Sequence, residues 1–447
     1  MPVNKNVFLH DDDKAALQAL KSIPGFTQFL KAFMSMWNEK AFRIANMSTN
    51  VRISKEQLPK YYDMLPPICA KLGIEVPELY LKLDPYPNSY TSGDEKPFIV
   101  ITSSLIDVLP EELIPTVLAH ECGHIACHHV LYHTMGQMIL NGMLAALPVA
   151  KVLTFPIQAA FAYWMRCSEF SADRAAILCD GGPEKMMEVC ARFAGYDKDI
   201  HEPINMEAFM DQARDYKELI ESSSFNKGLE TILFSMNSHP INAVRAYEAN
   251  EWAKSENYQR AKEYFASYDA GMLPDELPLP WDERGVLGQD AAKVEEELRG
   301  LGFRNIELQR STDRPLFSKD NSIYGVNVNG FRSFAEGDWV TPDTKIVLRY
   351  YKSLSEDELK ALHPGEIRLP RSARFLEGEK YFFVEKELRD AGYTNIHCEP
   401  IKDIVRDDDR NRYRVTSVSV NGDNKRSRGD WIKADTPIAI YYHDKIH

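Results

Sequence analysis

The chain has 447 residues, more than the roughly 250–300 at which a single hydrophobic core stops growing, so two or three domains are expected. Lys and Arg number 53 and Asp and Glu 66, and the resulting net charge of −13 argues against nucleic acid or an anionic membrane surface as the main partner. Seven cysteines, an odd number, need no pairing in a reducing compartment, and the first residues lack the pattern of a secretory signal. We therefore expect a cytoplasmic protein, with membrane association as the weaker alternative.

The first part of the chain has the pattern of a mainly helical domain, which we expect over residues 1–268. Apolar residues recur at three- and four-residue spacing in the segments 58–74, 111–133, 161–179 and 240–254. Residues 78–105 instead alternate β-branched and aromatic side chains around a Gly-Asp turn, which predicts a small hairpin or sheet.

One long apolar segment, residues 138–165, could be mistaken for a membrane span. A spanning helix needs about 20 consecutive apolar residues. Pro148, Lys151 and Pro156 divide this segment into shorter pieces. Buried helices are therefore favoured over a membrane hairpin, and we expect no integral membrane span.

Residues 269–284 are rich in Pro and Gly, which predicts a linker between domains.

Beyond this linker the sequence repeats itself with a period near 90 residues. EELRGLGFRNIEL at 296–308 matches KELRDAGYTNIHC at 386–398, and a VNG turn and a GDW triplet recur at matching places further on.

Each repeat has the pattern of a helix followed by alternating strands, with Gly330 and Gly422 at turns. We place the first repeat at 285–352, a second linker at 353–372 and the second repeat at 373–447, so that the fold class is α+β. The repeats resemble PASTA domains. Their ligand is unknown from the sequence, and recruitment or regulation is the role expected of them.

The most informative segment is HECGH, residues 120–124. On a helix, positions i and i+4 lie on one face about 6 Å apart along the axis, so His120 and His124 can converge on one metal ion. Glu121 is rotated away from that row and can reach a water molecule on the ion. Ile114, Val117 and Leu118 precede the site on the core face.

Three further histidines follow, but a straight helix cannot bring them to the same ion. His128 continues the i+4 row and lies about 12 Å along the axis from His120. We therefore interpret His128, His129 and His133 as face or packing histidines. Cys122 and Cys127 are interpreted as small buried side chains.

A third ligand must come from another helix, and Glu169 is the best candidate. Glu169 and Asp173 share one face of an otherwise apolar helix. Carboxylates facing a core are costly unless they are paired or bound to metal. Glu169 could bind the ion while Asp173 accepts a hydrogen bond from a histidine ring. An ordinary surface pair beside Arg174 is the alternative.

HECGH followed by SEFSAD resembles the HtpX-type and CAAX prenyl endopeptidase-type zinc metallopeptidases, gluzincins with the pattern HExxH…ExxxD. The segments before HECGH and around NSHPINAVRAYE extend the resemblance over most of the first 250 residues. The resemblance implies one zinc ion held by His120, His124 and Glu169. It also implies Glu121 as the general base and Asp173 as a support.

The same resemblance extends to residues outside the zinc helices. Asn88, Ser89 and Tyr90 would form the strand along which an extended substrate lies, although the family has Asn-Ala-Phe there. The resemblance places His239 and Arg245 in an element near the active site, and our hypothesis is that His239 stabilises the oxyanion while Arg245 pairs with a local carboxylate. The alternative is that His239 and Arg245 only join helices.

The expected activity is zinc-dependent hydrolysis of peptide bonds in a protein or peptide substrate by a metal-activated water. A catalytically silent, zinc-containing scaffold that acts through its repeats is the alternative from another class. Structural zinc sites are usually closed by four protein ligands and rich in cysteine, which a His-His-Glu set is not. A membrane-integrated protease is a third possibility.

Overall fold

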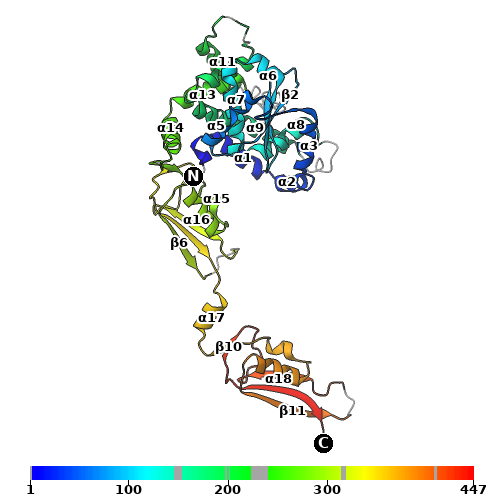
Figure 1. Ribbon diagram of the computed structural model, residues 1–447. Coiled ribbons are helices and arrows are strands. Elements are labelled where there is room, and N and C mark those ends of the chain that lie inside the picture. The colour runs from blue at the N-terminus through cyan, green and yellow to red at the C-terminus, as the bar shows by residue number, and fades with distance from the viewer. Residues whose placement is uncertain are drawn as a thin grey trace. The chain divides into compact units, whose positions relative to one another are not determined.

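The computed structural model describes residues 3–144, 154–196, 199–200, 202–222, 240–313, 319–406 and 410–446. The chain forms two compact units (Figure 1). The first comprises Met1–Gln309 with Asn321–Tyr350, and the second comprises Arg310–Asp320 with Tyr351–His447. The predicted α+β class is confirmed, because a mainly helical region with a small sheet is followed by modules that combine short helices with small sheets.

The helical region begins with the 3₁₀ turn η1 (Lys5–Val7) and is built from helices of very different lengths. Its described helices are α1 (Asp11–Ser22), α2 (Phe26–Met34), α3 (Glu39–Thr49), α4 (Pro59–Tyr62), α5 (Leu65–Leu72), α6 (Ser103–Val108), α7 (Ile114–Ala126), α8 (Val130–Leu140), α9 (Phe155–Asp180), α10 (Glu184–Phe193), α11 (Met206–Glu221), α13 (Asn242–Ala253) and α14 (Glu256–Asp269).

Helix α7, which contains HECGH, packs directly against α9 in the middle of this region (Figure 1). Ile114, Val117 and Leu118 are buried, as predicted. The two helices approach closely at Gly123, where an added Cβ would lie 2.8 Å from the Cβ of Ala175. A glycine is therefore required at this position of the motif if the α7–α9 distance is to be kept.

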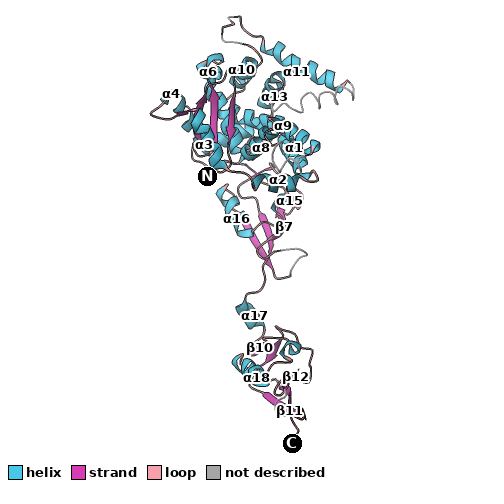
Figure 2. Ribbon diagram, turned by 90° about the vertical axis from the view of Figure 1, so that its right-hand side faces the viewer, coloured by secondary structure: helices cyan, strands magenta, loops and turns pink. Residues whose placement is uncertain are grey.

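The sheet predicted over 78–105 is present as β2 (Glu78–Lys82), β3 (Ser89–Ser92) and β4 (Phe98–Thr102), and it includes one further strand that was not predicted, β1 (Val51–Ile53). Their order is β1-β2-β4-β3, with β2 parallel and β3 antiparallel to β4. The sheet stands at one side of the helices (Figure 2). Because β3 is an edge strand, one side of its backbone is available for pairing with another chain.

The helix predicted over 111–133 is wrong in one respect, because it is interrupted. A 3₁₀ turn, η2 (Glu111–Leu113), precedes α7, and α7 ends at Ala126. His128 adopts a positive φ of 59°, and α8 starts two residues later. The chain changes direction here, which brings the histidines that follow back toward α7.

The apolar segment 138–165 is divided between the end of α8 and the start of α9, where Pro156 occupies the first turn. Residues 145–153, with Pro148 and Lys151, lie outside the described residues. Within the described ranges, none of the helices combines the length and the apolar character that a membrane crossing requires.

The two repeats have the same topology. The first contains α16 (Ala291–Gly300) and a sheet of order β6-β9-β7, formed by β6 (Ile306–Ser311), β9 (Ile346–Tyr351) and β7 (Ile323–Val328). The second contains α18 (Tyr381–Asp390) and a sheet of order β11-β14-β12, formed by β11 (Ile396–Ile404), β14 (Ile438–Lys445) and β12 (Val415–Val420).

Smaller elements are duplicated as well. The pair β5 (Leu277–Pro278) and β8 (Trp339–Val340) corresponds to β10 (Glu366–Arg368) and β13 (Trp431–Lys433). Further short helices are α15 (Glu283–Val286), α17 (Glu356–Leu362) and the 3₁₀ turn η4 (Ala373–Leu376). Both VNG turns place Asn and then Gly at positive φ, and each turn is closed by an isolated antiparallel bridge, Val328 with Phe331 and Val420 with Asp423.

The stretch predicted as the first linker is packed within the first unit. Leu277, Leu279 and Trp281 are buried. The side-chain amides of Asn4 and Asn6 donate to the carbonyl oxygens of Pro278 and Leu279 at 2.7 and 2.9 Å. The predicted domain boundaries remain predictions.

Candidate metal centre

The two histidines of HECGH point at one carboxylate on the neighbouring helix. His120 Nε2 lies 3.4 Å from Glu169 Oε2, and His124 Nε2 lies 3.3 Å from Glu169 Oε1. Ligand atoms of the three residues all lie within 4.8 Å of one another. Glu169 is only 1% exposed and Asp173 only 3%, so the alternative of an ordinary surface pair is wrong.

This donor set fits zinc. Two imidazole nitrogens and a carboxylate are common ligands of catalytic zinc, which keeps its fourth position open. Donors bound at about 2.0–2.1 Å to one tetrahedral ion lie roughly 3.4 Å apart, close to the separations found here. His120, His124 and Glu169 can therefore hold one zinc ion without rearrangement of their helices.

His120 is supported from behind by an ion pair. Its Nδ1 lies 2.8 Å from Asp173 Oδ1, and Arg245 on α13 donates to the same carboxylate through Nε at 2.9 Å and Nη2 at 2.5 Å. Arg245 is 6% exposed, so the pair is shielded from water. The structure thus brings together His120, Asp173 and Arg245, three residues that the sequence singled out.

The ion pair shapes the electrostatics of the site. Burial raises the pKa of Asp173, but the charge and hydrogen bonds of Arg245 outweigh it and lower the pKa overall. Burial likewise lowers the pKa of His120, but hydrogen bonds and charges from Asp173 and Glu169 raise it to about 10. For His124, burial prevails and the pKa is lowered.

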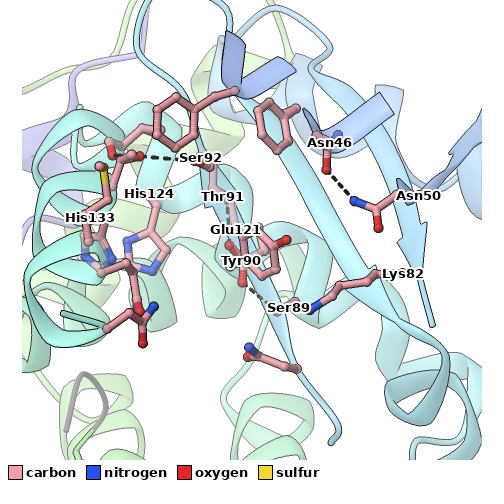
Figure 3. A pocket seen from close by; sticks show the side chains of 18 of the residues that line it. Asn46, Asn50, Lys82, Ser89, Tyr90, Thr91, Ser92, Glu121, His124 and His133 are labelled. Atoms are coloured by element: carbon pink, nitrogen blue, oxygen red, sulfur yellow. Dashed lines mark hydrogen bonds between the residues drawn. The ribbon is translucent and has the colours of Figure 1, made fainter. Parts of the chain in front are cut away.

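Glu121 is held by strand β3. Ser89 Oγ donates to Glu121 Oε1 at 2.5 Å and Thr91 Oγ1 donates to Oε2 at 2.7 Å (Figure 3). Residues 89 and 91 share one face because side chains alternate along a strand. Thr91 was not among the residues predicted from the sequence, although this alternation could have identified it once Ser89 was placed near the site.

Two cavities open beside the metal-binding set. One of about 540 Å³ is bordered by α3, β3 and α8, and one of about 180 Å³ lies toward α10 and α13. Asn88, Ser89, His120, Glu121 and Glu169 line both cavities. His120 and Glu169 therefore border open space on two sides and His124 on one, unlike the ligands of a closed structural site.

The remaining predicted residues have different outcomes. Tyr90 lies in β3, and Asn88 precedes it with its backbone bonded to Thr102. Cys122 and Cys127 are buried, as predicted. His239 lies outside the described residues.

The histidines after HECGH are closer to the site than expected. His128 is exposed, but His124, His129 and His133 have ligand atoms within 4.8 Å of one another. His133 Nε2 lies 2.7 Å from Ser168 Oγ, and His129 Nε2 lies 3.0 Å from Asp13 Oδ2. The set containing Glu169 is the better zinc site, because it supplies a carboxylate and all three of its members line a cavity, whereas His129 lines neither cavity.

Comparisons with known proteins agree with this geometry. The model of peptidase family M48 matches residues 64–253. A plastoglobule-localized metallopeptidase 48 from the chloroplast of Arabidopsis thaliana is 34% identical over 255 residues, covering 56% of this chain and 74% of the relative. A protease HtpX homolog from Ralstonia pickettii is 22% identical over 188 residues, covering 37% of this chain and 65% of the relative.

A crystal structure of the three-PASTA-domain region of a Staphylococcus aureus Ser/Thr kinase matches with 13% identity and a TM-score of 0.15, covering 38% of this chain and 66% of that one. A likeness at this level carries no conclusion about the repeats. The helical region is different, because its family match, its relatives and its buried His-His-Glu set agree. The chain therefore belongs to peptidase family M48 and is a zinc-dependent endopeptidase.

Proposed function

We propose that His120, His124 and Glu169 hold one zinc ion per chain and that Glu121 is the general base for peptide-bond hydrolysis. The observation that supports this proposal is the convergence of three buried donors beside Glu121, where two cavities meet. A bound zinc ion would lower the pKa of a water molecule and polarise the substrate carbonyl.

Glu121 accepts the proton of the attacking water and returns it to the leaving amine. Ser89 and Thr91 fix the orientation of its carboxylate, since each hydroxyl donates to a different oxygen. Asp173, itself held by Arg245, fixes the ring of His120. We further propose that His239 stabilises the oxyanion, since the family resemblance places its segment near the active site.

The substrate lies extended along Asn88, Ser89 and Tyr90, adding its backbone to the free edge of β3. It would cross the site from one cavity to the other. Phe42, Phe98 and Met138 line the larger cavity, which suits a bulky apolar side chain of the substrate. Backbone pairing of this kind selects unfolded or flexible chains more than a particular sequence.

The catalytic region would span 1–268, followed by a linker at 269–284, and the repeats at 285–352 and 373–447 would recruit or regulate substrates through a ligand still to be identified. All seven cysteines are free in the structure, which suits a reducing compartment such as the cytoplasm. Cell fractionation with a tagged chain tests this location.

Replacing Glu121 by Gln tests the proposed base. We expect the variant to bind one zinc ion and to cleave unfolded casein with a kcat lower by roughly 10²–10⁴-fold. Glu112→Gln, at an exposed glutamate just before α7, is the matched control and should cleave normally. Equal activity of Glu121→Gln and the wild type would rule out the proposed base.

Replacing Glu169 by Ala tests the ligand assignment separately. We expect zinc and activity to be lost together, as measured by metal analysis of the purified chain. Stoichiometric zinc in the Glu169→Ala variant would move the third ligand to another residue.

A further inference from the structure

His124 has a second ring nitrogen, and it faces another buried histidine. His124 Nδ1 lies 3.1 Å from His129 Nδ1. On the far side of that ring, His129 Nε2 lies 3.0 Å from Asp13 Oδ2. His129 is 2% exposed and Asp13 is 1% exposed. A continuous line of polar contacts therefore leads from a proposed zinc ligand to a buried carboxylate on α1.

The interruption after α7 makes this line possible. His129 N donates to the carbonyl oxygen of His124 at 2.9 Å, which folds the end of α7 back on itself. The positive φ of His128 turns the chain at this point. In an uninterrupted helix, His129 would be rotated about 140° from His124 and could not meet its ring.

Asp13 is held rigidly at the other end of the line. Its Oδ1 accepts from Trp164 Nε1 at 2.8 Å, and its Oδ2 accepts from Ser171 Oγ at 2.6 Å. Both donors are on α9, the helix that also carries Glu169. Asp13 itself lies before residues 64–253, the range that the family model matches.

The direction of each hydrogen bond follows from metal binding. If His124 binds zinc through Nε2, its ring proton must be on Nδ1, which then donates to His129 Nδ1. His129 must in turn carry its proton on Nε2 and donate it to Asp13. If His129 Nδ1 instead donated to His124 Nδ1, the ring proton of His124 would be on Nε2, where it prevents zinc binding.

We propose that His129 and Asp13 are positioning residues that keep His124 in the tautomer and orientation that bind zinc. This inference rests on the proposed function, because it takes His124 to be a zinc ligand. The carboxylate at the end of the line accepts only, so it sets the direction of both hydrogen bonds. An N-terminal helix outside the family match thereby supports the metal centre.

The Asp13→Asn variant of the full-length chain tests the direction of the hydrogen bonds that join His124, His129 and Asp13. Trp164 needs an acceptor, so the amide oxygen takes the Oδ1 position and the amide NH₂ faces His129. This group donates where the carboxylate accepted, which reverses both hydrogen bonds and opposes zinc binding. We expect zinc affinity, measured by competition with a chromogenic chelator, to fall about 10–100-fold.

Asp12→Asn is the matched control, since its side chain is 63% exposed on the same turn of α1. It should bind zinc as tightly as the wild type. The visible absorption of the cobalt(II)-substituted protein provides a second readout, because it reports the ligand geometry. We expect the spectrum of Asp13→Asn to change and that of Asp12→Asn to match the wild type.

Two substitutions of His129 keep the inference testable if Asp13→Asn does not fold. A glutamine can accept from His124 through its oxygen and donate to Asp13 through its nitrogen, so His129→Gln should retain most of the zinc affinity. His129→Leu can do neither and should lose it. Equal zinc affinity in the Gln and Leu variants, or wild-type affinity and spectrum in a folded Asp13→Asn, would overturn the proposal.

The Glu169→Ala experiment separates this inference from the proposed function. If Glu169→Ala loses zinc while Asp13→Asn binds it normally, the ligand set holds and the positioning role fails. If Glu169→Ala keeps stoichiometric zinc, the ligand assignment itself fails.

Discussion

The two histidines of HECGH are supported by different parts of the chain. Behind His120 are Asp173 and Arg245, and both lie within the range that matches the M48 family. Behind His124 are His129 and Asp13, and Asp13 comes from an N-terminal helix before that range. The motif supplies the two imidazoles, but separate tertiary contacts hold the second nitrogen of each ring.

The two supports also differ in their energetics. Arg245 and Asp173 form a buried ion pair, and removal of one partner leaves an uncompensated charge in the core. The line behind His124 is a series of directional hydrogen bonds, whose reversal changes the tautomer of the ligand. Substitution of Asp173 or Arg245 should therefore mainly lower the stability of the fold. Substitution of His129 or Asp13 should mainly lower the affinity for zinc.

The largest effect is expected when Arg245 is replaced by Met. Asp173 then remains buried without its cation, and we expect the free energy of unfolding to fall by about 3–5 kcal/mol, measured by urea denaturation. Lys217→Met is the control, because Lys217 pairs with Glu248 at the surface, where it is 45% exposed, and its loss should cost less than about 1 kcal/mol. Similar losses in the two variants would contradict the contrast drawn between buried and exposed pairs.

A smaller effect is expected at Gly123, where both histidines depend on the same packing. In Gly123→Ala the new Cβ would lie 3.0 Å from the backbone of Ala172, so α7 must move away from α9 and from Glu169. We expect about 1–3 kcal/mol of destabilisation together with weaker zinc binding.

Gly136→Ala is the matched control for this change. There the new Cβ would meet Met165 Sδ, which belongs to a flexible side chain that can move aside. If Gly123→Ala binds zinc as tightly as Gly136→Ala does, the α7–α9 distance does not set the ligand spacing.

Much of the ligand set could be predicted from the sequence, because it depends on short-range periodicity. His120 with His124, and Glu169 with Asp173, are i and i+4 pairs, so each pair shares a helix face whatever surrounds it. The β3–β4 hairpin was predictable for a similar reason, from alternation around the Gly-Asp turn.

The support of His124 could not be predicted, because one of its causes leaves only a weak signal in the sequence and the other is a contact between distant segments. No proline or glycine marks the interruption after Ala126, and a histidine such as His128 is a much weaker signal of positive φ than a glycine. Asp13 reaches the site only because α1 packs on α9, a contact between segments far apart in the sequence. Periodicity alone therefore led to the interpretation of His129 as a packing residue.

The smallest effect is expected from the first repeat, which contacts α1 but not the site. Lys14 Nζ donates to the carbonyl oxygen of Glu336 at 3.2 Å, next to Asp13 on α1. A chain ending at residue 353 retains this contact, and a chain ending at residue 281 loses it but retains the bonds from Asn4 and Asn6 to residues 278 and 279. Both truncated chains should fold and cleave a short peptide.

Zinc affinity should separate the two truncations slightly. A single hydrogen bond contributes about 0.5–1.5 kcal/mol to stability. Because the bond from Lys14 acts on His124 only indirectly, through α1 and Asp13, its effect on zinc binding should be smaller than this. We expect the chain ending at 353 to match the full-length protein in the chelator competition, and the chain ending at 281 to bind zinc up to a few-fold more weakly. Identical affinities in the two truncated chains would mean that the first repeat does not affect zinc binding by His124. A loss in the chain ending at 281 as large as that in Asp13→Asn would make the first repeat an integral part of the metal centre.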